Sequence, residues 1–242
     1  MTTKLFLELS GLFGGLLALG FVACLPLFNG QVRLFVQSKL FTKLVFWIPI
    51  YVIFCLVITG GLIAAGIVSS LLIAQAGREF IHNKGRNYWF TCLYFVTIVT
   101  SLVTLPLFFL NHDNTRVANI LVTVCFGSAL SDVCAFFAGS YRGQHHLPRF
   151  INAGKSYEGV LGQIVGAFVG IGLVSLLPEI EFSWQLALIV GVASAVGDLL
   201  NSVAKRMLSI KDWGQFIPGH GGVLDRFASL ALAIAASWLY SF

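Results

Sequence analysis

The chain has 242 residues, of which 57% are hydrophobic and only 10% are charged. A soluble domain carries roughly 25% charged residues, so this composition cannot cover a globular surface with polar groups. It excludes a disordered chain, a nucleic-acid-binding domain and a disulfide-stapled secreted fold. The formal net charge of +5 therefore describes the loops of a membrane protein and gives no reason to expect a nucleic-acid partner. We expect an all-α, polytopic transmembrane helical bundle that forms a single membrane domain.

Candidate membrane spans follow one another along most of the chain, because a bilayer crossing needs about 20 mostly apolar residues. The stretch 44–76 is ambiguous, since it fits either one long tilted helix or two short arms that turn at Gly60 and Gly61. A shorter apolar stretch, 227–242, ends the chain. The clear candidates are residues 5–28, 90–110, 119–139, 159–178 and 184–204.

The basic residues of the loops set the expected orientation, because Lys and Arg accumulate in short cytoplasmic loops. The loops before and after the stretch 44–76 are both basic, which favours an even number of spans between them and therefore a hairpin at Gly60 and Gly61. The later loops alternate between the outside and the cytoplasmic side, and their charges agree with that assignment. We expect about eight spans with both termini outside, or seven if the ambiguous stretch is one helix. The bases concerned are Arg33, Lys39, Lys43, Arg78, Lys84 and Arg86.

Two acidic residues lie inside predicted spans, where a carboxylate needs a partner or a function. Asp132 and Asp198 are at matching depths, roughly 10 Å below the cytoplasmic ends of their helices. Asn201 and Ser202 lie on the same helix face as Asp198. We expect the two acids to share a polar cavity that opens to the cytoplasm. The alternative is that each acid pairs with a neighbouring Lys or backbone group. Glu8, near the outer end of the first span, needs no specific role.

The segment 205–226 gathers charges and glycines in one predicted loop. Glycines allow backbone N–H groups to approach an anion closely, and Lys and Arg supply the charge that a polyphosphate needs. Asp225 together with Asp132 and Asp198 offers hard oxygen ligands for a divalent cation such as Mg²⁺. The pattern predicts a nucleotide-phosphate and Mg²⁺ site at the membrane surface, with a loop that binds lipid headgroups as the alternative. The residues concerned are Lys205, Arg206, Lys211, Asp212, His220, Gly221, Gly222, Asp225 and Arg226.

The same segment carries a long motif, S-x-x-K-R-x4-K-D followed by P-G-H-G-G-x-x-D-R, at residues 202–226. This motif resembles the signature of the CDP-diacylglycerol synthase (phosphatidate cytidylyltransferase) family. The upstream residues 131–159 also resemble that family, and the resemblance covers about residues 128–229 as a whole. The upstream positions that match are Asp132, Phe136, Gly139, Gly143, Leu147, Lys155, Glu158 and Gly159.

The resemblance implies an enzyme of phospholipid biosynthesis that converts CTP and phosphatidate, or a related lipid phosphate, to CDP-diacylglycerol and pyrophosphate. Cations on Asp132, Asp198 and Asp225, namely Mg²⁺ and a second cation, would bridge the triphosphate. Asp198, Asp225, Lys205 and Arg226 would form the catalytic set. The substrate-binding set would comprise Ser202, Lys155, Arg206, Lys211, Asp212, His220, Gly221 and Gly222, with a structural role for His220 as the alternative.

Three positions depart from the family pattern. Ala228 replaces the last acid of the D-R-x-D-S ending, Asn201 stands where the family often has Glu, and residues 152–153 replace a Ser-Pro pair. Ala cannot ligate a metal, so if the missing acid is a cation ligand in the family, we expect this chain to bind metal weakly and to turn over slowly. Three explanations stay open: a deliberate inactivating substitution, a divergent member that uses another acid, or a relative that works on another lipid phosphate.

The sequence predicts two regions, N-terminal transmembrane helices at 1–118 and a catalytic region at 119–242 with cytoplasmic loops 140–158 and 205–226. We expect a multi-pass protein of a bacterial inner membrane, with its active site facing the cytoplasm and with membrane lipids, CTP and a homodimer as its partners. Other readings are a CTP-dependent kinase of lipid alcohols such as polyprenol or phytol, a catalytically weak lipid-binding homologue, and a transporter. A transporter would place its acids near the membrane centre, whereas these acids lie toward one side.

Overall fold

The computed structural model describes residues 3–83, 88–148, 151, 154–216 and 221–241, and within these ranges it forms helices and no β-strand. The all-α class is therefore confirmed. Six of the described helices are long and apolar enough to cross a membrane, and Phe6–Val22 is a shorter apolar helix. The elements are α1 (Thr3–Cys24), the 3-10 helix η1 (Leu25–Phe28), α2 (Val32–Val36), α3 (Lys39–Val45), α4 (Trp47–His82), α5 (Tyr88–Asn111), α6 (Asn114–Arg142), α8 (Tyr157–Val174), α9 (Trp184–Met207) and α10 (Val223–Tyr240).

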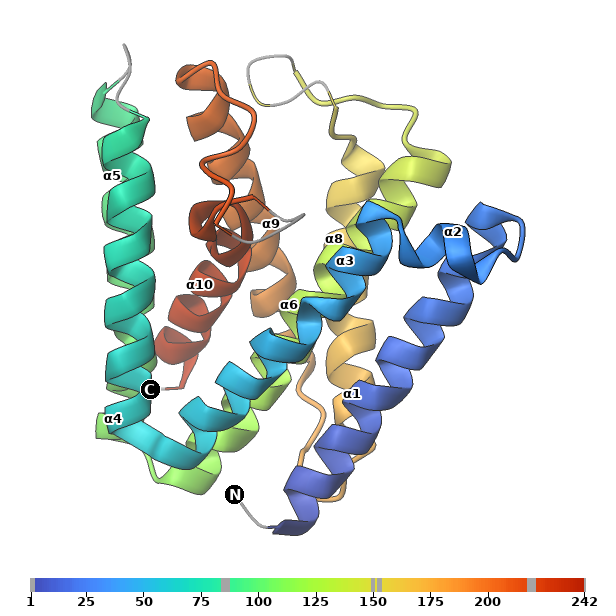
Figure 1. Cartoon of the computed structure of the whole chain (residues 1–242). Coiled ribbons are helices and arrows are strands. Elements are labelled where there is room, and N and C mark those ends of the chain that lie inside the picture. Colours follow the sequence, from blue (N-terminus) through green and yellow to red (C-terminus); the bar gives the residue numbers. More distant parts are fainter. Residues whose placement is uncertain (1–2, 84–87, 149–150, 152–153, 217–220, 242) are drawn as a thin grey trace.

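Helix α4 is broken at Gly61, whose φ of 60° and ψ of −142° are not helical. The first arm packs on α1, where Tyr51 stacks on Phe13 with ring centroids 4.1 Å apart. The second arm packs on α5, where Phe80 stacks on Phe95 at 4.6 Å. Figure 1 shows the two arms diverging from the break. A glycine accepts this positive φ without steric cost, so the predicted turn is confirmed. The count of about eight spans stays a prediction.

The predicted loop 205–226 is too long at both ends. Lys205 and Arg206 belong to the last turn of α9, and Asp225 and Arg226 lie in the first turn of α10. Basic residues at a helix C-terminus and an acidic residue at a helix N-terminus are both favourable to the helix dipole. Hydropathy alone assigns such charged turns to a loop. The segments that connect the helices are 143–156 and 208–222.

Glycines let α8 lie directly against α6. A Cβ at Gly162 would come within 2.7 Å of Ala138 Cβ, one at Gly166 within 2.7 Å of Cys134 Cβ, and one at Gly170 within 3.0 Å of the Cα of Gly127. The three glycines follow one another at intervals of four residues, which is the spacing of close helix contacts in membranes. The backbones of α6 and α8 therefore approach each other along most of α8.

Helices α9 and α10 make a similar contact at one point. A Cβ at Gly197 would lie 2.9 Å from the carbonyl carbon of Ala228, so a glycine is needed at this crossing. The contact brings Asp198, the next residue of α9, beside the first turns of α10. The predicted regions 1–118 and 119–242 share an apolar cluster that contains Tyr94 of α5 and Leu224 of α10. The boundary between these regions stays a prediction.

The first testable prediction concerns the α6–α8 contact. Gly166→Ala should lower the free energy of unfolding by about 1–3 kcal/mol, because the new methyl overlaps Cys134. Gly172→Ala on the same helix is the matched control, since a Cβ there meets nothing within 4 Å. Thermal unfolding of the purified protein in detergent compares the two variants. Equal midpoints for both would contradict the close packing.

Candidate functional site

The helix ends that carry the predicted site residues lie toward one end of the bundle (Figure 1). They are the C-terminal ends of α6 and α9 and the N-terminal ends of α8 and α10. The N-terminus and the C-terminus of the chain lie toward the other end (Figure 1). The side chains at the first end form two groups, one around Asp198 and one around Asp225.

The Asp198 group joins α9 to the start of α8. Lys155 forms an ion pair with the Asp198 carboxylate, and its Nζ also donates to the Asp198 carbonyl oxygen at 3.1 Å. Gln163 Nε2 donates to Asp198 Oδ2 at 3.3 Å. The side chains of Lys155 and Asp198 are 23% and 35% exposed, so water reaches the pair. The sequence left open whether Asp198 shares a polar cavity with Asp132 or pairs with a neighbouring lysine. In the structure it pairs with Lys155.

Asp132 on α6 completes this group. Its Oδ2 accepts a hydrogen bond from Ser229 Oγ at 3.3 Å, and the charges of Asp198 and Arg226 act on it. The glycines of α8 bring that helix close to α6, and Gly197 brings α9 close to α10. The two acids predicted to lie at one depth are therefore neighbours, although each also has a partner of its own.

The Asp225 group is more deeply buried. Lys205 Nζ and Asp225 Oδ1 are 2.7 Å apart, and the Asp225 side chain is 4% exposed. Asp225 Oδ2 accepts the backbone N–H of Trp213 at 2.8 Å and that of Gly222 at 2.9 Å. Both oxygens of Asp225 are thus in use, one on α9 and one on the connecting segment 208–222. The carboxylate stabilises this segment against the start of α10.

Two glycines predicted to bind phosphate have packing roles in this group. The N–H of Gly222 already donates to Asp225, so it is not free for an anion in this conformation. Gly221 has a φ of +88°, and a Cβ there would lie 2.8 Å from Asp225 Oδ2. Both positions need glycine because Asp225 lies so close to the backbone. Their contact with a substrate stays a prediction.

A buried polar cluster lies behind the Asp225 group. Asn201 Oδ1 accepts hydrogen bonds from Tyr94 Oη at 3.0 Å and from Trp213 Nε1 at 2.8 Å. The Tyr94 and Trp213 rings stack with centroids 5.8 Å apart. Asn201 therefore serves as a double acceptor. Its side chain thereby links α9 to α5 and to the segment 208–222.

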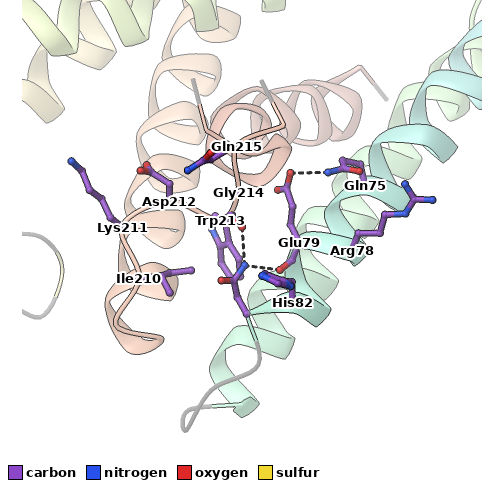
Figure 2. A pocket seen from close by; sticks show the side chains of 11 residues that line it. Gln75, Arg78, Glu79, His82, Ile210, Lys211, Asp212, Trp213, Gly214 and Gln215 are labelled. Carbon is purple, nitrogen blue, oxygen red and sulfur yellow. Dashed lines mark hydrogen bonds between the residues drawn. The ribbon is translucent and has the colours of Figure 1, made fainter. Parts of the chain in front are cut away.

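The other predicted substrate-binding residues differ in exposure. Ser202 is buried at 4% exposure, whereas Arg206, Lys211 and Asp212 are exposed. His220 lies outside the described residues. Lys211 and Asp212 line a cavity of about 760 Å³ together with residues of α4. Figure 2 shows Lys211 extending away from the α4 side chains.

Sequence reasoning missed Glu79. This residue lies in α4, is 5% exposed, and accepts the backbone N–H groups of Val223 and Leu224 at the start of α10. The available signal was an acid directly after a long apolar stretch in a chain with only ten acidic residues. Arg78, Lys84 and Arg86 surround it in the sequence, so the pattern predicts a basic loop there. Gln163, buried on α8 beside Asp198, carries no charge, so the charge pattern of its span does not single it out.

The acids fit the predicted Mg²⁺ only in part. Among the described residues, no three His, Cys, Asp or Glu side chains could together hold a metal ion. Asp132 and Asp198 are neighbouring hard oxygen donors, which suits a Mg²⁺ ion that keeps several water ligands. Asp225 does not suit it in this arrangement, because Lys205 and two N–H groups occupy its oxygens. Its role as a ligand stays a prediction.

Comparison with known proteins places these residues in a family. The family model described as "Cytidylyltransferase family" matches residues 6–242, nearly the whole chain. The chain belongs to the cytidylyltransferase family.

Curated relatives match part of this cytidylyltransferase chain. A phosphatidate cytidylyltransferase of Brucella suis is 39% identical over 114 residues, which cover 46% of this chain and 42% of the relative. The phosphatidate cytidylyltransferase of Haemophilus influenzae is 33% identical over 156 residues, covering 61% and 54%. That of Helicobacter pylori is 40% identical over 107 residues, covering 41% and 38%. The chain thus matches about half or less of the length of these relatives.

The second prediction compares the two ion pairs. Lys205→Met should cost about 3–5 kcal/mol of stability, because it leaves Asp225 buried without its cation. Lys155→Met should cost at most about 1 kcal/mol, because Asp198 stays within reach of water. Denaturant titration of each variant in detergent measures the two values. A larger loss for Lys155→Met would contradict the difference in burial.

Proposed function

We propose that the protein joins CTP to phosphatidate and releases pyrophosphate. A phosphate oxygen of phosphatidate attacks the α-phosphorus of CTP, and the bond from that phosphorus to the oxygen shared with the β-phosphate breaks. The products are CDP-diacylglycerol and pyrophosphate. The observation that carries the proposal is the gathering of Lys155, Lys205 and Arg226 with Asp132 and Asp198 at one end of the helical bundle of a chain that belongs to the cytidylyltransferase family.

The work of the protein in this reaction is to bring two anions together and to neutralise their charge. Lys155 lies just before α8, Lys205 lies in the last turn of α9, and Arg226 follows Asp225 in the first turn of α10. A lysine ammonium has three donors, so Lys205 keeps donors for a phosphate while Asp225 fixes its position. Arg206 and Lys211, both exposed, are suited to attract CTP from water.

Asp132 and Asp198 are the residues that would hold Mg²⁺, with a second cation as a further expectation. A bound cation neutralises triphosphate oxygens and orients them for displacement. Lys155, which lies just before α8, forms an ion pair with Asp198 and so holds this carboxylate in place.

The substrates set where the site has to open. CTP is soluble and phosphatidate is a lipid, so the site would open both to the cytoplasm and to the cytoplasmic leaflet of the membrane. Because the relatives named above are bacterial proteins, the proposal places the protein in a bacterial inner membrane. The basic loops favour that orientation by the positive-inside rule. Membrane lipids surround the bundle, and association into a homodimer is part of the proposal.

The third prediction tests the reaction itself. Purified protein in detergent–lipid micelles receives Mg²⁺, CTP labelled at the α- or the γ-phosphate, and either phosphatidate or a lipid alcohol. The proposal expects label from the α-position, and none from the γ-position, to enter the lipid. Transfer of the γ-label to a lipid alcohol would instead identify a kinase. Binding of CTP without any transfer would identify a catalytically weak homologue.

The fourth prediction concerns Ala228, which is 2% exposed and lies against Gly197, the neighbour of Asp198. Ala228→Asp restores the acid of the family ending and is expected to raise Mg²⁺-dependent turnover about tenfold or more. Ala228→Asn is the matched control, because it has the same shape without the charge. An unchanged or lower rate in the folded Asp variant would show that this position is not a metal ligand.

A further inference from the structure

Glu79 is a buried carboxylate that the proposed reaction does not use. Its Oε1 accepts the backbone N–H of Val223 at 2.8 Å, and its Oε2 accepts that of Leu224 at 3.0 Å. Gln75 Nε2, one turn earlier in α4, donates to Oε1 at 3.2 Å. Both carboxylate oxygens are therefore directed at the first turn of α10, a helix 144 residues further along the chain.

This contact answers a need of every helix N-terminus, where the first N–H groups have no partner within the helix. Glu79 accepts from Val223 and Leu224, while Asp225 accepts from Gly222. Two carboxylates thus cap one helix, at the end where the dipole is positive. Hydrogen bonds to a charged acceptor are stronger than neutral ones, so α10 is firmly held to α4.

The glycines of the connecting segment make room for the Glu79 side chain. A Cβ at Gly222 would lie 2.6 Å from Glu79 Cδ, and one at Gly214 would lie 3.5 Å from Glu79 Cγ. Asn83 adds a link one turn later, because its Nδ2 donates to the Glu79 carbonyl at 2.8 Å and to the Trp213 carbonyl at 2.7 Å. Figure 2 shows Glu79 between Gln75 and the segment of Trp213 and Gly214.

The held turn is the one that carries charged groups of the proposed site. Asp225 is the third residue of α10 and binds Lys205 of α9, and Arg226 follows it. A shift of this turn relative to α4 would move Asp225, and with it the ammonium that Asp225 fixes. Glu79 is therefore connected to Lys205 through two contacts, its own hydrogen bonds to the first turn of α10 and the bond from Lys205 to Asp225 in that turn.

We propose that Glu79 is a positioning residue for the cytidylyl transfer: by binding the first two N–H groups of α10, it sets the places of Lys205 and Arg226. The inference rests on the proposed function. Glu79 itself touches no substrate in this scheme. A glutamine would not replace it, because its single oxygen accepts only part of the contact and its NH₂ group would face N–H donors.

The test compares Glu79→Gln and Glu79→Asp with the wild type, and uses Glu181→Gln, an exposed glutamate in the loop before α9, as control. Hydrogen exchange of the peptide that contains Val223 and Leu224 reports the contact directly, and steady-state kinetics with CTP and phosphatidate report its effect. Glu79→Gln should raise that exchange and lower kcat about tenfold or more, while the KM for CTP changes less than about threefold. The exposed Arg206 and Lys211 still attract CTP, which is why KM is spared. Glu79→Asp keeps the charge on a shorter side chain and should recover part of kcat.

The outcomes separate the two proposals. An active wild type whose folded Glu79→Gln variant keeps full kcat, or keeps slow exchange at Val223 and Leu224, would overturn the role of Glu79 alone. If Glu79→Gln does not fold, Glu79→Asp decides in its place, and faster exchange at Val223 and Leu224 with an unchanged kcat in that variant would overturn the role. A wild type without transfer, with Glu181→Gln equally inactive, would overturn the proposed function and the catalytic part of this inference with it.

Discussion

A carboxylate inside a membrane bundle is stable only if a cation or several N–H or O–H groups meet it, and the site end of this protein is arranged by that requirement. Asp198 meets Lys155, and Asp225 meets Lys205. Glu79 meets the first turn of α10. Each of these contacts links two different helices or a helix and a connecting segment. The few acids of the chain therefore also hold the helix ends in register.

These polar contacts are short-range, so they require helices that approach closely. The glycines of α8 provide this on the α6 side, where an added Cβ would overlap α6. Gly197 provides it where α9 crosses α10. Gly222 provides it for Glu79. Asp198 follows Gly197 directly, and the N–H of Val223 that Glu79 binds follows Gly222 directly. A bulky residue at either glycine would therefore disturb both the packing of the backbone and the position of a charged group.

The parts of the structure that the sequence predicted well are those governed by local pattern. The apolar stretches became helices, and the break at Gly61 appeared where two glycines interrupt a long apolar run between two basic loops. The matching depth that the helical rise predicts for Asp132 and Asp198 stays a prediction. Their partners could not be predicted in the same way. That Ser229 would bond Asp132 depends on how α6 and α10 cross, which no local pattern records.

Glu79 shows the same limit more sharply. Its neighbours in sequence suggested a basic loop, yet its function in the fold depends on N–H groups 144 positions away. From the sequence, Gly222 is expected to let the backbone approach a phosphate. The structure gives it a different reason, because Gly222, like Gly214, lies against the Glu79 side chain. A glycine-rich motif therefore constrains the space around a backbone without saying whether a ligand or another side chain of the same protein fills it.

The two lysine–carboxylate pairs differ in their exposure to water, which decides how easily a ligand can replace one partner of a pair. Taking a charge away from its partner is costly in a dry interior and cheap where water can replace the partner. Asp225 is almost completely buried, and its oxygens are shared among a lysine and two backbone groups, so this pair serves as a fixed anchor. The pair of Lys155 and Asp198 is partly open to water, and Lys155 lies outside the helices, two residues before the start of α8. Under the proposed function, a substrate phosphate would replace Asp198 as the partner of Lys155, and Asp198 would then be available to a cation. The buried pair of Lys205 and Asp225 would keep α9 and α10 in place during that exchange.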